Sequence, residues 1–428
     1  MTTSTFAART FSVLSRRTAG LAVGLGILLA ANPSQATFHV PASQATVKLN
    51  STDGQCSLYE AIDALNQGKT APGASLHGCV QDAQGGAMIE LEGNGAHYKT
   101  FGSDIAVQME IFAYAPLNFA YLEHSGPSAV LTNSAGTAST PTRISNVTIQ
   151  HTGTNPGRVI TNTGRLKLES VTIKSGNVSA NAGTAAYGGG IYNSGDGGVE
   201  LSSVSVISNT AKRGGGIYSA TINGIGLTKT SVTNNTATEI GGGLYTGGRL
   251  NVTTATISDN VATGNGGGVY CDHGQNSYCS FGYTTISNNK GALGGGVYRR
   301  SNNATCESAG TCSRPTLRSS ILSGNKNGSN AADDYYGDPH LAEAGGTFET
   351  RSLFTTFANT TSHPFDFIGN AGLGALQNNF GMVTKSRAIS STSDAKDKNP
   401  AFCPQQDQNF KTRPSGPSCD LGAYELQQ

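Results

Sequence analysis

The sequence predicts an all-β protein. We expect a single-stranded right-handed parallel β-helix, a solenoid, with a short N-terminal capping helix and an irregular, disulfide-stapled C-terminal cap. The main observation is a Gly-Gly-Gly-aliphatic-Tyr signature that recurs in steps of 26, 27, 25 and 28 residues and ends at Tyr192, Tyr218, Tyr245, Tyr270 and Tyr298. A fixed period of this length indicates stacked repeats. The repeats are rich in Gly, Ser, Thr and β-branched residues, which favours strands over helices.

The first 36 residues have the pattern of a signal peptide. Basic residues precede an apolar run over 19–31, and Ser34 and Ala36 form a small-x-small cleavage site. The apolar run is too short to span a membrane, which takes about 20 residues. We therefore expect export, with no transmembrane anchor, to the periplasm, the cell surface or the medium of a bacterium.

Residues 37–84 are expected to contain the N-terminal cap. Ser57 and Glu60 have the spacing of a capping box at the start of a helix. The residues that would form the apolar face of this helix are Leu58, Ala61, Ile62 and Leu65. Such a helix would close the first coil, since the end of a solenoid exposes strand edges that need a cover.

Residues 85–330 are expected to form the repeats. A second motif lies between the signatures, in phase with them, and its aliphatic residue should point inward. The motif is centred on Val206, Val232, Ile257 and Ile286, and it closes with Asn209, Asn235, Asn260 and Asn289. Amide side chains stacked in register can form a ladder, and asparagine tolerates turns. The triple glycine suits a corner where a Cβ atom would collide with the next coil.

The repeat is lost from about residue 331, so residues 331–428 are expected to form the C-terminal cap. The eight cysteines fall into four pairs that are local in sequence, which in an oxidising compartment indicates disulfides rather than zinc ligands. The expected pairs are Cys56–Cys79, Cys271–Cys279, Cys306–Cys312 and Cys403–Cys419.

Two end motifs carry a resemblance to a known group. The heptapeptide 56–62, Cys-Ser-Leu-Tyr-Glu-Ala-Ile, resembles the CSLREA motif of exported bacterial β-helix proteins, with Tyr59 where arginine is usual. Residues 419–425, Cys-Asp-Leu-Gly-Ala-Tyr-Glu, resemble the CDIGAYE ending of the same group, and the repeats resemble those of polymorphic outer-membrane proteins. The resemblance implies a β-helix at or outside the cell surface. We expect free export, because no β-barrel pattern follows the repeats.

The composition excludes two classes of partner. Charged residues make up 13% of the chain and the net charge is +1, so there is no electrostatic footprint for nucleic acid or for an anionic membrane. The surface is hydroxyl-rich and neutral. The fold class, the widened loops and the tyrosine ladder described below suggest polysaccharide or cell-envelope glycan as the partner. The sequence indicates no oligomeric state.

Two features are candidate substrate-binding sites. Strand alternation would send Tyr218, Tyr245, Tyr270 and Tyr298 outward as a ladder, which offers ring faces to a glycan or simply stiffens the stack. The widened loops of the last two clear repeats carry further polar candidates, which would meet across one coil spacing and bind an acidic sugar, or form a solvated insertion with a surface ion pair. These residues are Asp272, His273, Arg299 and Arg300.

A local cluster of acidic residues and a histidine occupies Asp333, Asp334, Asp338 and His340, where a solvated turn is expected in preference to a metal site. No metal or cofactor is expected otherwise, except Ca²⁺ if the protein is a lyase.

Two functional hypotheses of different classes remain open. The first is an exported, non-catalytic β-helix that acts by contact, as an adhesin-like, envelope or matrix component. The alternative is a polysaccharide lyase or glycoside hydrolase, which the fold class permits but which needs titratable groups converging in a groove. The sequence shows no GxSxG, HExxH or P-loop motif and identifies no catalytic residue.

Overall fold

The computed structural model of the chain describes residues 37–46, 54–71, 73–82, 87–114, 119–273, 277–301, 315–337, 352–354, 367–381, 383–399 and 403–428. Three of the predictions lie outside these ranges: the signal peptide over 1–36, the Cys306–Cys312 pair, and the part of the acidic cluster at Asp338 and His340.

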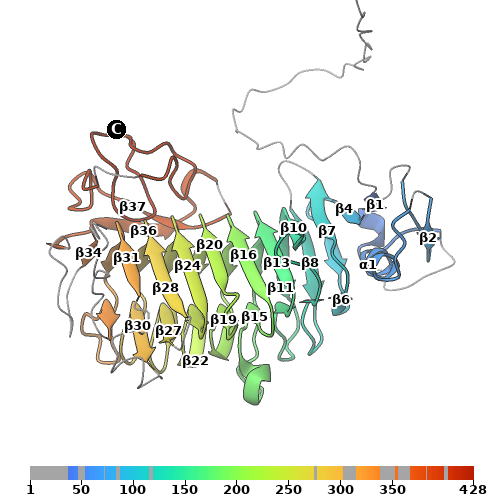
Figure 1. The fold of residues 1–428 in the computed structure, drawn as a ribbon, viewed down its shortest axis with the longest axis horizontal. Coiled ribbons are helices and arrows are strands. Elements are labelled where there is room, and N and C mark those ends of the chain that lie inside the picture. The colour runs from blue at the N-terminus through green and yellow to red at the C-terminus, as the bar shows by residue number, and fades with distance from the viewer. Residues whose placement is uncertain are drawn as a thin grey trace, which may run out of the picture. The chain divides into compact units, whose positions relative to one another are not determined.

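Three long parallel sheets form the sides of the molecule (Figure 1). Sheet I contains β1 (Thr37–Val40), β4 (Met88–Glu92), β7 (Glu110–Tyr114), β10 (Thr142–Ser145), β13 (Arg165–Glu169), β16 (Gly198–Ser202), β20 (Ile225–Thr228), β24 (Arg249–Thr253), β28 (Tyr278–Gly282) and β31 (Thr316–Arg318).

Sheet II contains β5 (His97–Lys99), β8 (Ala120–His124), β11 (Val147–His151), β14 (Thr172–Lys174), β17 (Ser205–Ile207), β21 (Ser231–Thr233), β25 (Thr256–Ser258), β29 (Thr285–Ser287), β32 (Ile321–Ser323), β34 (Leu353–Phe354) and β35 (Phe367–Ile368). Sheet III contains β6 (Ser103–Ile105), β9 (Leu131–Asn133), β12 (Ile160–Asn162), β15 (Ile191–Asn193), β19 (Ile217–Ser219), β23 (Leu244–Thr246), β27 (Val269–His273), β30 (Val297–Ser301) and β33 (Tyr335–Tyr336).

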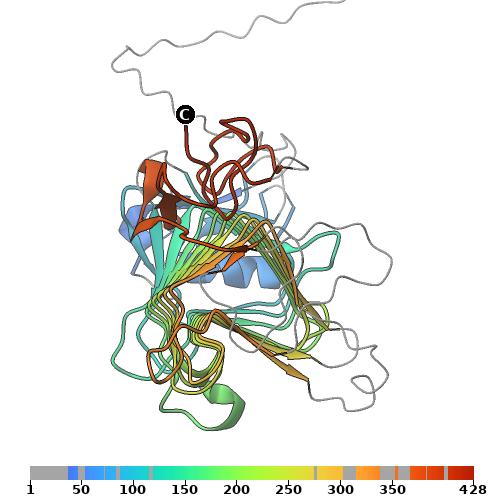
Figure 2. The ribbon, with the colours of Figure 1, turned by 90° about the vertical axis from the view of Figure 1, so that its left-hand side faces the viewer.

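Each turn of the chain visits sheets I, II and III in that order, as in β7, β8 and β9, and the next turn pairs in parallel with the one before it. This is the predicted right-handed parallel β-helix, seen nearly end-on in Figure 2. The sheets extend past the expected repeat region of 85–330, since β1 is the first strand of sheet I and β33, β34 and β35 come after residue 330.

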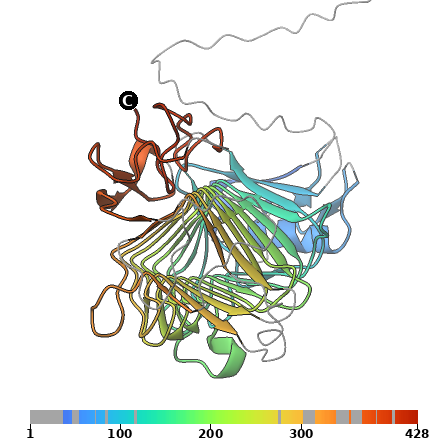
Figure 3. The same ribbon diagram turned by 60° about the vertical axis from the view of Figure 1, so that its left-hand side comes forward.

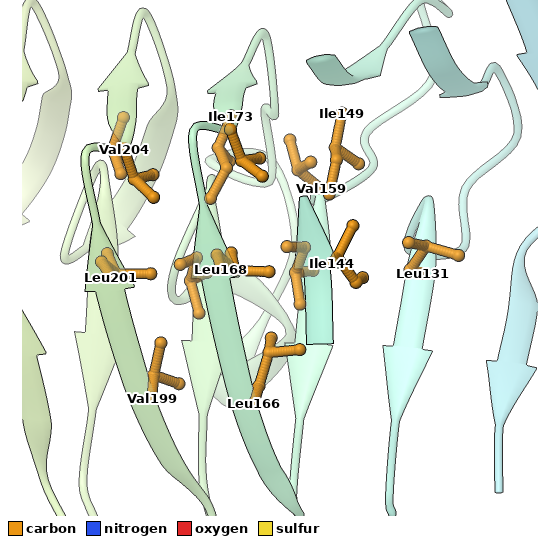
Figure 4. Close-up of a cluster of buried hydrophobic side chains, with 14 of the residues drawn as sticks. Leu131, Ile144, Ile149, Val159, Leu166, Leu168, Ile173, Val199, Leu201 and Val204 are labelled. Carbon is orange, nitrogen blue, oxygen red and sulfur yellow. The ribbon is translucent and has the colours of Figure 1, made fainter. Parts of the chain in front are cut away.

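The core is a column of aliphatic side chains in each sheet. Sheet III supplies the aliphatic residue of the signature, such as Ile191 and Ile217, and sheet II supplies Val206 and Val232 of the second motif, all fully buried. Figure 4 shows the same stacking in earlier coils, where Leu166 and Leu168 face the interior together with Val199 and Leu201 of the next coil. Because successive side chains of a strand point to opposite faces, the same strands also present outer faces, which set the possible sites.

The triple glycine lies at the corner that leads into sheet III, as predicted. Gly214 has a φ of +60°, which favours glycine. A Cβ atom on Gly215 would lie 2.4 Å from the carbonyl oxygens of both Thr236 and Gly242. Close coil spacing at this corner therefore requires glycine. A short fourth sheet precedes the corner, with strands β18 (Thr210–Arg213), β22 (Thr236–Ile240) and β26 (Val261–Ala262).

The predicted asparagine ladder is present and fully buried. Each side-chain amide donates to the oxygen of the next, for example Asn209 Nδ2 to Asn235 Oδ1 at 3.0 Å and Asn260 Nδ2 to Asn289 Oδ1 at 2.9 Å. Asn325 continues the ladder, and its amide donates to Asp334 Oδ1 at 2.8 Å. The residue before each ladder position takes the positive φ, not the ladder asparagine itself: Ser208, Asn234, Asp259 and Asn288.

The N-terminal cap is confirmed. Helix α1 (Leu58–Asn66) begins at a capping box in which Ser57 Oγ accepts from the Glu60 N–H and Glu60 Oε2 accepts from the Ser57 N–H. Its apolar face is buried against the first strands of all three sheets. These strands are β1 and β4 of sheet I, β5 of sheet II and β6 of sheet III. A disulfide joins Cys56 to Cys79, next to the antiparallel pair β2 (Ser75–Leu76) and β3 (Cys79–Val80). Short 3-10 helices occupy Ala42–Gln44, Gly183–Ala186 and Asn379–Gly381.

The C-terminal segment, residues 367–428, is largely irregular and contains the predicted Cys403–Cys419 disulfide. Beyond β35, its strands are the antiparallel pair β36 (Leu373–Gln377) and β37 (Ser386–Ile389). The described part of this segment lies along the flank of the stack, over the outer face of sheet II (Figure 2 and Figure 3). It reaches back as far as Lys229, whose Nζ donates to Gln406 Oε1 at 2.7 Å.

Candidate functional site

The tyrosine ladder forms on the outer face of sheet III, at the predicted positions. Tyr192, Tyr218, Tyr245, Tyr270 and Tyr298 stack with ring centroids 4.7 to 5.5 Å apart. The stack continues to Tyr336, 5.4 Å from Tyr298. Tyr336 was missed because its repeat lacks the triple glycine.

The ring faces of this stack are occupied. Tyr218, Tyr245 and Tyr270 are 8%, 7% and 4% exposed, since each lies between two other rings and Ile240 and Tyr187 pack against the stack. Burial raises the pKa of Tyr218 to about 12. The ring faces are therefore not open to a glycan, and stiffening of the coils is the role that this geometry supports.

The predicted polar patch is brought together in part. Asp272 and Arg300 face each other across one coil spacing, and Asp272 Oδ2 accepts a hydrogen bond from Tyr245 Oη at 2.7 Å. Burial, followed by the hydrogen bond to Asp272, raises the pKa of Tyr245. Arg300 is exposed and its hydrogen bond with Tyr270 raises the arginine pKa. Arg299 is 5% exposed and so is withdrawn from the surface.

The remaining predicted residues of this region lie at the following positions. His273 belongs to β27, but its side chain is outside the described part of the structure. Cys271 and Cys279 form the predicted disulfide between β27 and β28. Asp333 and Asp334 are 3% and 0% exposed, and Asp333 Oδ2 accepts from the Gly294 N–H at 2.7 Å. Asp333 thus binds a backbone N–H group of the last coils, and Asp334 accepts from the last asparagine of the ladder.

A hollow on the outer face of sheet I was missed by the sequence reasoning. It has a volume of about 260 Å³ and lies over β13, β16, β20, β24 and β28. Its polar lining consists of Thr137, Arg165, Glu200, Asn223, Arg249, Asn251 and Tyr278. Glu200, Arg249, Asn251 and Tyr278 are exposed. The sequence signal was the placement of Gly198 in one coil and of Gly224 and Gly226 in the next, on an outer face, which is visible only once the register is known.

A second hollow lies beside the first coils of sheet I, with a volume of about 620 Å³. His39 Nδ1 lies 2.6 Å from Glu90 Oε2, and Glu92 Oε2 accepts from the Ala42 N–H at 2.8 Å. Glu90 and Glu92 are alternate residues of β4, so their side chains share one face and stand about 7 Å apart along the strand. This hollow brings His39 together with Glu90 and Glu92, which lie 51 and 53 residues later in the sequence.

Comparison with known proteins gives one match. Residues 254–272 match the model of the Chlamydia polymorphic membrane protein repeat. The matched stretch contains β25, β26 and the start of β27, and so includes the second motif and the glycine signature of one coil. No curated protein and no solved structure matches the chain. The resemblance of the repeats is thereby supported for this coil, while the two end motifs stay predictions.

Two further observations concern the described residues alone. No helix among them is long and apolar enough to cross a membrane. Within the same ranges, no group of three or more His, Cys, Asp or Glu side chains is placed to hold a metal ion.

Proposed function

We propose that this chain is an exported bacterial surface protein that acts by contact, through an outer face of its β-helix that binds glycan. Support for the surface location comes from the repeat match at 254–272, whose family is a membrane protein family, and from the three disulfides among the described residues, which suit an oxidising compartment.

The observation that carries the binding role is the hollow on sheet I. Its exposed arginine, asparagine, glutamate and tyrosine side chains stand on rigid parallel strands. Such groups supply the hydrogen bonds and the aromatic surface that fix a polar ligand, and the strands fix their backbone positions, so that no loop has to be ordered on binding.

Binding assays test this proposal directly. The exported full chain, purified from the secreted fraction, is titrated against neutral and acidic polysaccharides by affinity electrophoresis and calorimetry. We expect saturable binding to at least one polysaccharide, with no release of reducing ends or unsaturated products. Absence of binding across the whole panel would overturn the proposal.

A glycoside hydrolase is the second candidate, favoured by the hollow beside the first coils. The spacing of Glu90 and Glu92, about 7 Å along the strand, falls among the carboxyl separations of inverting hydrolases, about 6.5 to 9.5 Å. If reducing ends are released, Glu90→Gln and Glu92→Gln should each abolish the release, and retained release in both variants would remove this candidate.

A further inference from the structure

Two arginines line the hollow on sheet I, and they lie in one register column. The column runs Arg165, Gly198, Gly224, Arg249 and Tyr278, one residue from each successive coil. Arg165 and Arg249 are thus three coil spacings apart, about 14 Å at about 4.8 Å per spacing. The guanidinium group of Arg165 lies over Gly198, and that of Arg249 lies 6.0 Å from the ring centroid of Tyr278.

Gly226 leaves part of the floor of the hollow bare. A Cβ atom on Gly226 would meet no atom within 4 Å, and the backbone there has no positive φ that would require glycine. Gly226 stands in register with Glu200 and Asn251, both exposed. A side chain would therefore fit at Gly226 at no steric cost to the fold, and its absence leaves a gap between Glu200 and Asn251.

The repeat of the coils suits a repeating ligand. A pyranose unit is comparable in length to one coil spacing, so a linear polysaccharide lying along the solenoid axis places about one sugar over each coil. Guanidinium groups bind carboxylates with two parallel hydrogen bonds. Asn251 and Glu200 would bind sugar hydroxyl groups between them, and the Tyr278 ring offers a surface for a sugar face.

We infer that the hollow on sheet I binds a linear acidic polysaccharide, such as a polyuronate, along the axis of the β-helix, with carboxylates of sugars three units apart on Arg165 and Arg249. This inference deepens the proposed function and rests on it. The hollow discriminates by charge: Glu200 is the single carboxylate among its lining residues, against two guanidinium groups.

A glycine substitution tests the site without disturbing the fold. Gly226→Glu places bulk and negative charge on the open floor, and we expect affinity for a polyuronate to fall at least tenfold. The matched control is Gly282→Glu, because Gly282 also lies on sheet I with no atom within 4 Å of an added Cβ, but outside the hollow. The control should bind as the unsubstituted chain does, and circular dichroism and thermal melting should show both variants folded.

The arginines test the charge recognition. Arg165→Ala and Arg249→Ala should each lower the affinity about tenfold, since each removes a charge-assisted contact. Binding should weaken as salt is raised, and a neutral glucan should bind more weakly than the polyuronate. If the chain binds a polyuronate and Gly226→Glu matches Gly282→Glu, the inference is wrong while the proposed function stands. Equal binding of neutral and acidic chains would remove the acidic assignment, and no binding at all would remove both proposals.

Discussion

The outer faces of sheets I and II differ although the same coils build them. On sheet II, from β21 onward, hydroxyl side chains are buried beneath the C-terminal segment: Ser231 Oγ accepts from the Lys385 N–H, Thr256 Oγ1 donates to Gln408 Oε1 at 2.6 Å, and Thr285 Oγ1 accepts from the Ala423 N–H. On sheet I, at the same level of the stack, Arg249 and Asn251 remain exposed.

The difference shows how outward residues decide the use of a face. The small hydroxyl groups on sheet II each form a single hydrogen bond with the C-terminal segment, which runs along the sheet. Arg387 of this segment also donates to both carboxylate oxygens of Asp259, at 2.8 and 3.0 Å. Long charged side chains and glycines on sheet I leave hollows that a flat chain would not fill. A solenoid can therefore cover one side with its own chain and keep another for a ligand.

The largest expected effect on stability concerns the C-terminal segment that covers sheet II. Arg413 and Glu425 are fully buried, with Nε and Oε2 3.4 Å apart, and Arg413 also donates to the Gly422 carbonyl at 2.8 Å. Arg413→Met leaves the glutamate without its partner and should lower the free energy of unfolding by about 3 to 5 kcal/mol. Denaturant unfolding measures it. The matched change on sheet I, Arg249→Met, should stay within about 0.5 kcal/mol, and an equal loss in both would contradict the comparison.

A smaller effect is expected for a single hydroxyl. Thr256→Val keeps the shape of the side chain but strands the buried oxygen of Gln408, and should cost about 1 to 2 kcal/mol. Thr316→Val makes the same change at an exposed position of sheet I and should be close to neutral. Limited proteolysis would show whether the threonine change releases the C-terminal segment, and full resistance with unchanged stability would mean that the cover does not depend on this contact.

The smallest effect concerns pH at the uncovered end of sheet II. Burial acts to raise the pKa of Glu123, but hydrogen bonds from Lys99, Gln150 and His97 outweigh it, so the pKa lies below its usual 4.5. The ionised form therefore stabilises the fold above about pH 4.5, and this contribution is lost as the pH falls through the lowered folded-state pKa.

Glu123→Gln should thus cost on the order of 1 kcal/mol at neutral pH, and the difference from the unsubstituted chain should shrink in acid. Thermal melts across that pH range give the comparison. A difference that stays constant with pH would show that the charge of Glu123 is not what stabilises this end. In the C-terminal segment, burial instead raises the pKa of Glu425. The contribution of Glu425 to the free energy of unfolding therefore has the opposite pH dependence: it is present in acid and is lost as the pH rises.

Much of the fold could be predicted because each coil repeats the same local rule. The inward aliphatic residues, the glycine corner, the asparagine ladder and the capping box follow from spacing alone. The burial of the tyrosine stack did not follow, because Tyr187 and Ile240 reach it from other strands and turns. The lateral path of the C-terminal segment depends on contacts such as Arg387 with Asp259, 128 residues apart, which no local pattern reveals.

The site was predictable only in part for the same reason. Asp272 and Arg300 meet because each lies two residues after a signature tyrosine, and this equal spacing can be counted in the sequence. The hollow on sheet I depends on which glycines face outward, and the step between coils there varies from 25 to 33 residues, as from Arg165 to Gly198 and from Gly224 to Arg249. Without a clear signature on that sheet, the sequence alone could not align those positions.

The asparagine ladder makes the coils interchangeable. Every link joins the same donor to the same acceptor, so a coil of this part of the chain can be duplicated or removed without leaving an amide unmatched. Only the last link differs, since the Asn325 amide donates to a carboxylate oxygen of Asp334 and not to the oxygen of another amide. The length of the molecule can therefore change by whole coils through duplication within its gene, provided that the closing aspartate remains at the end.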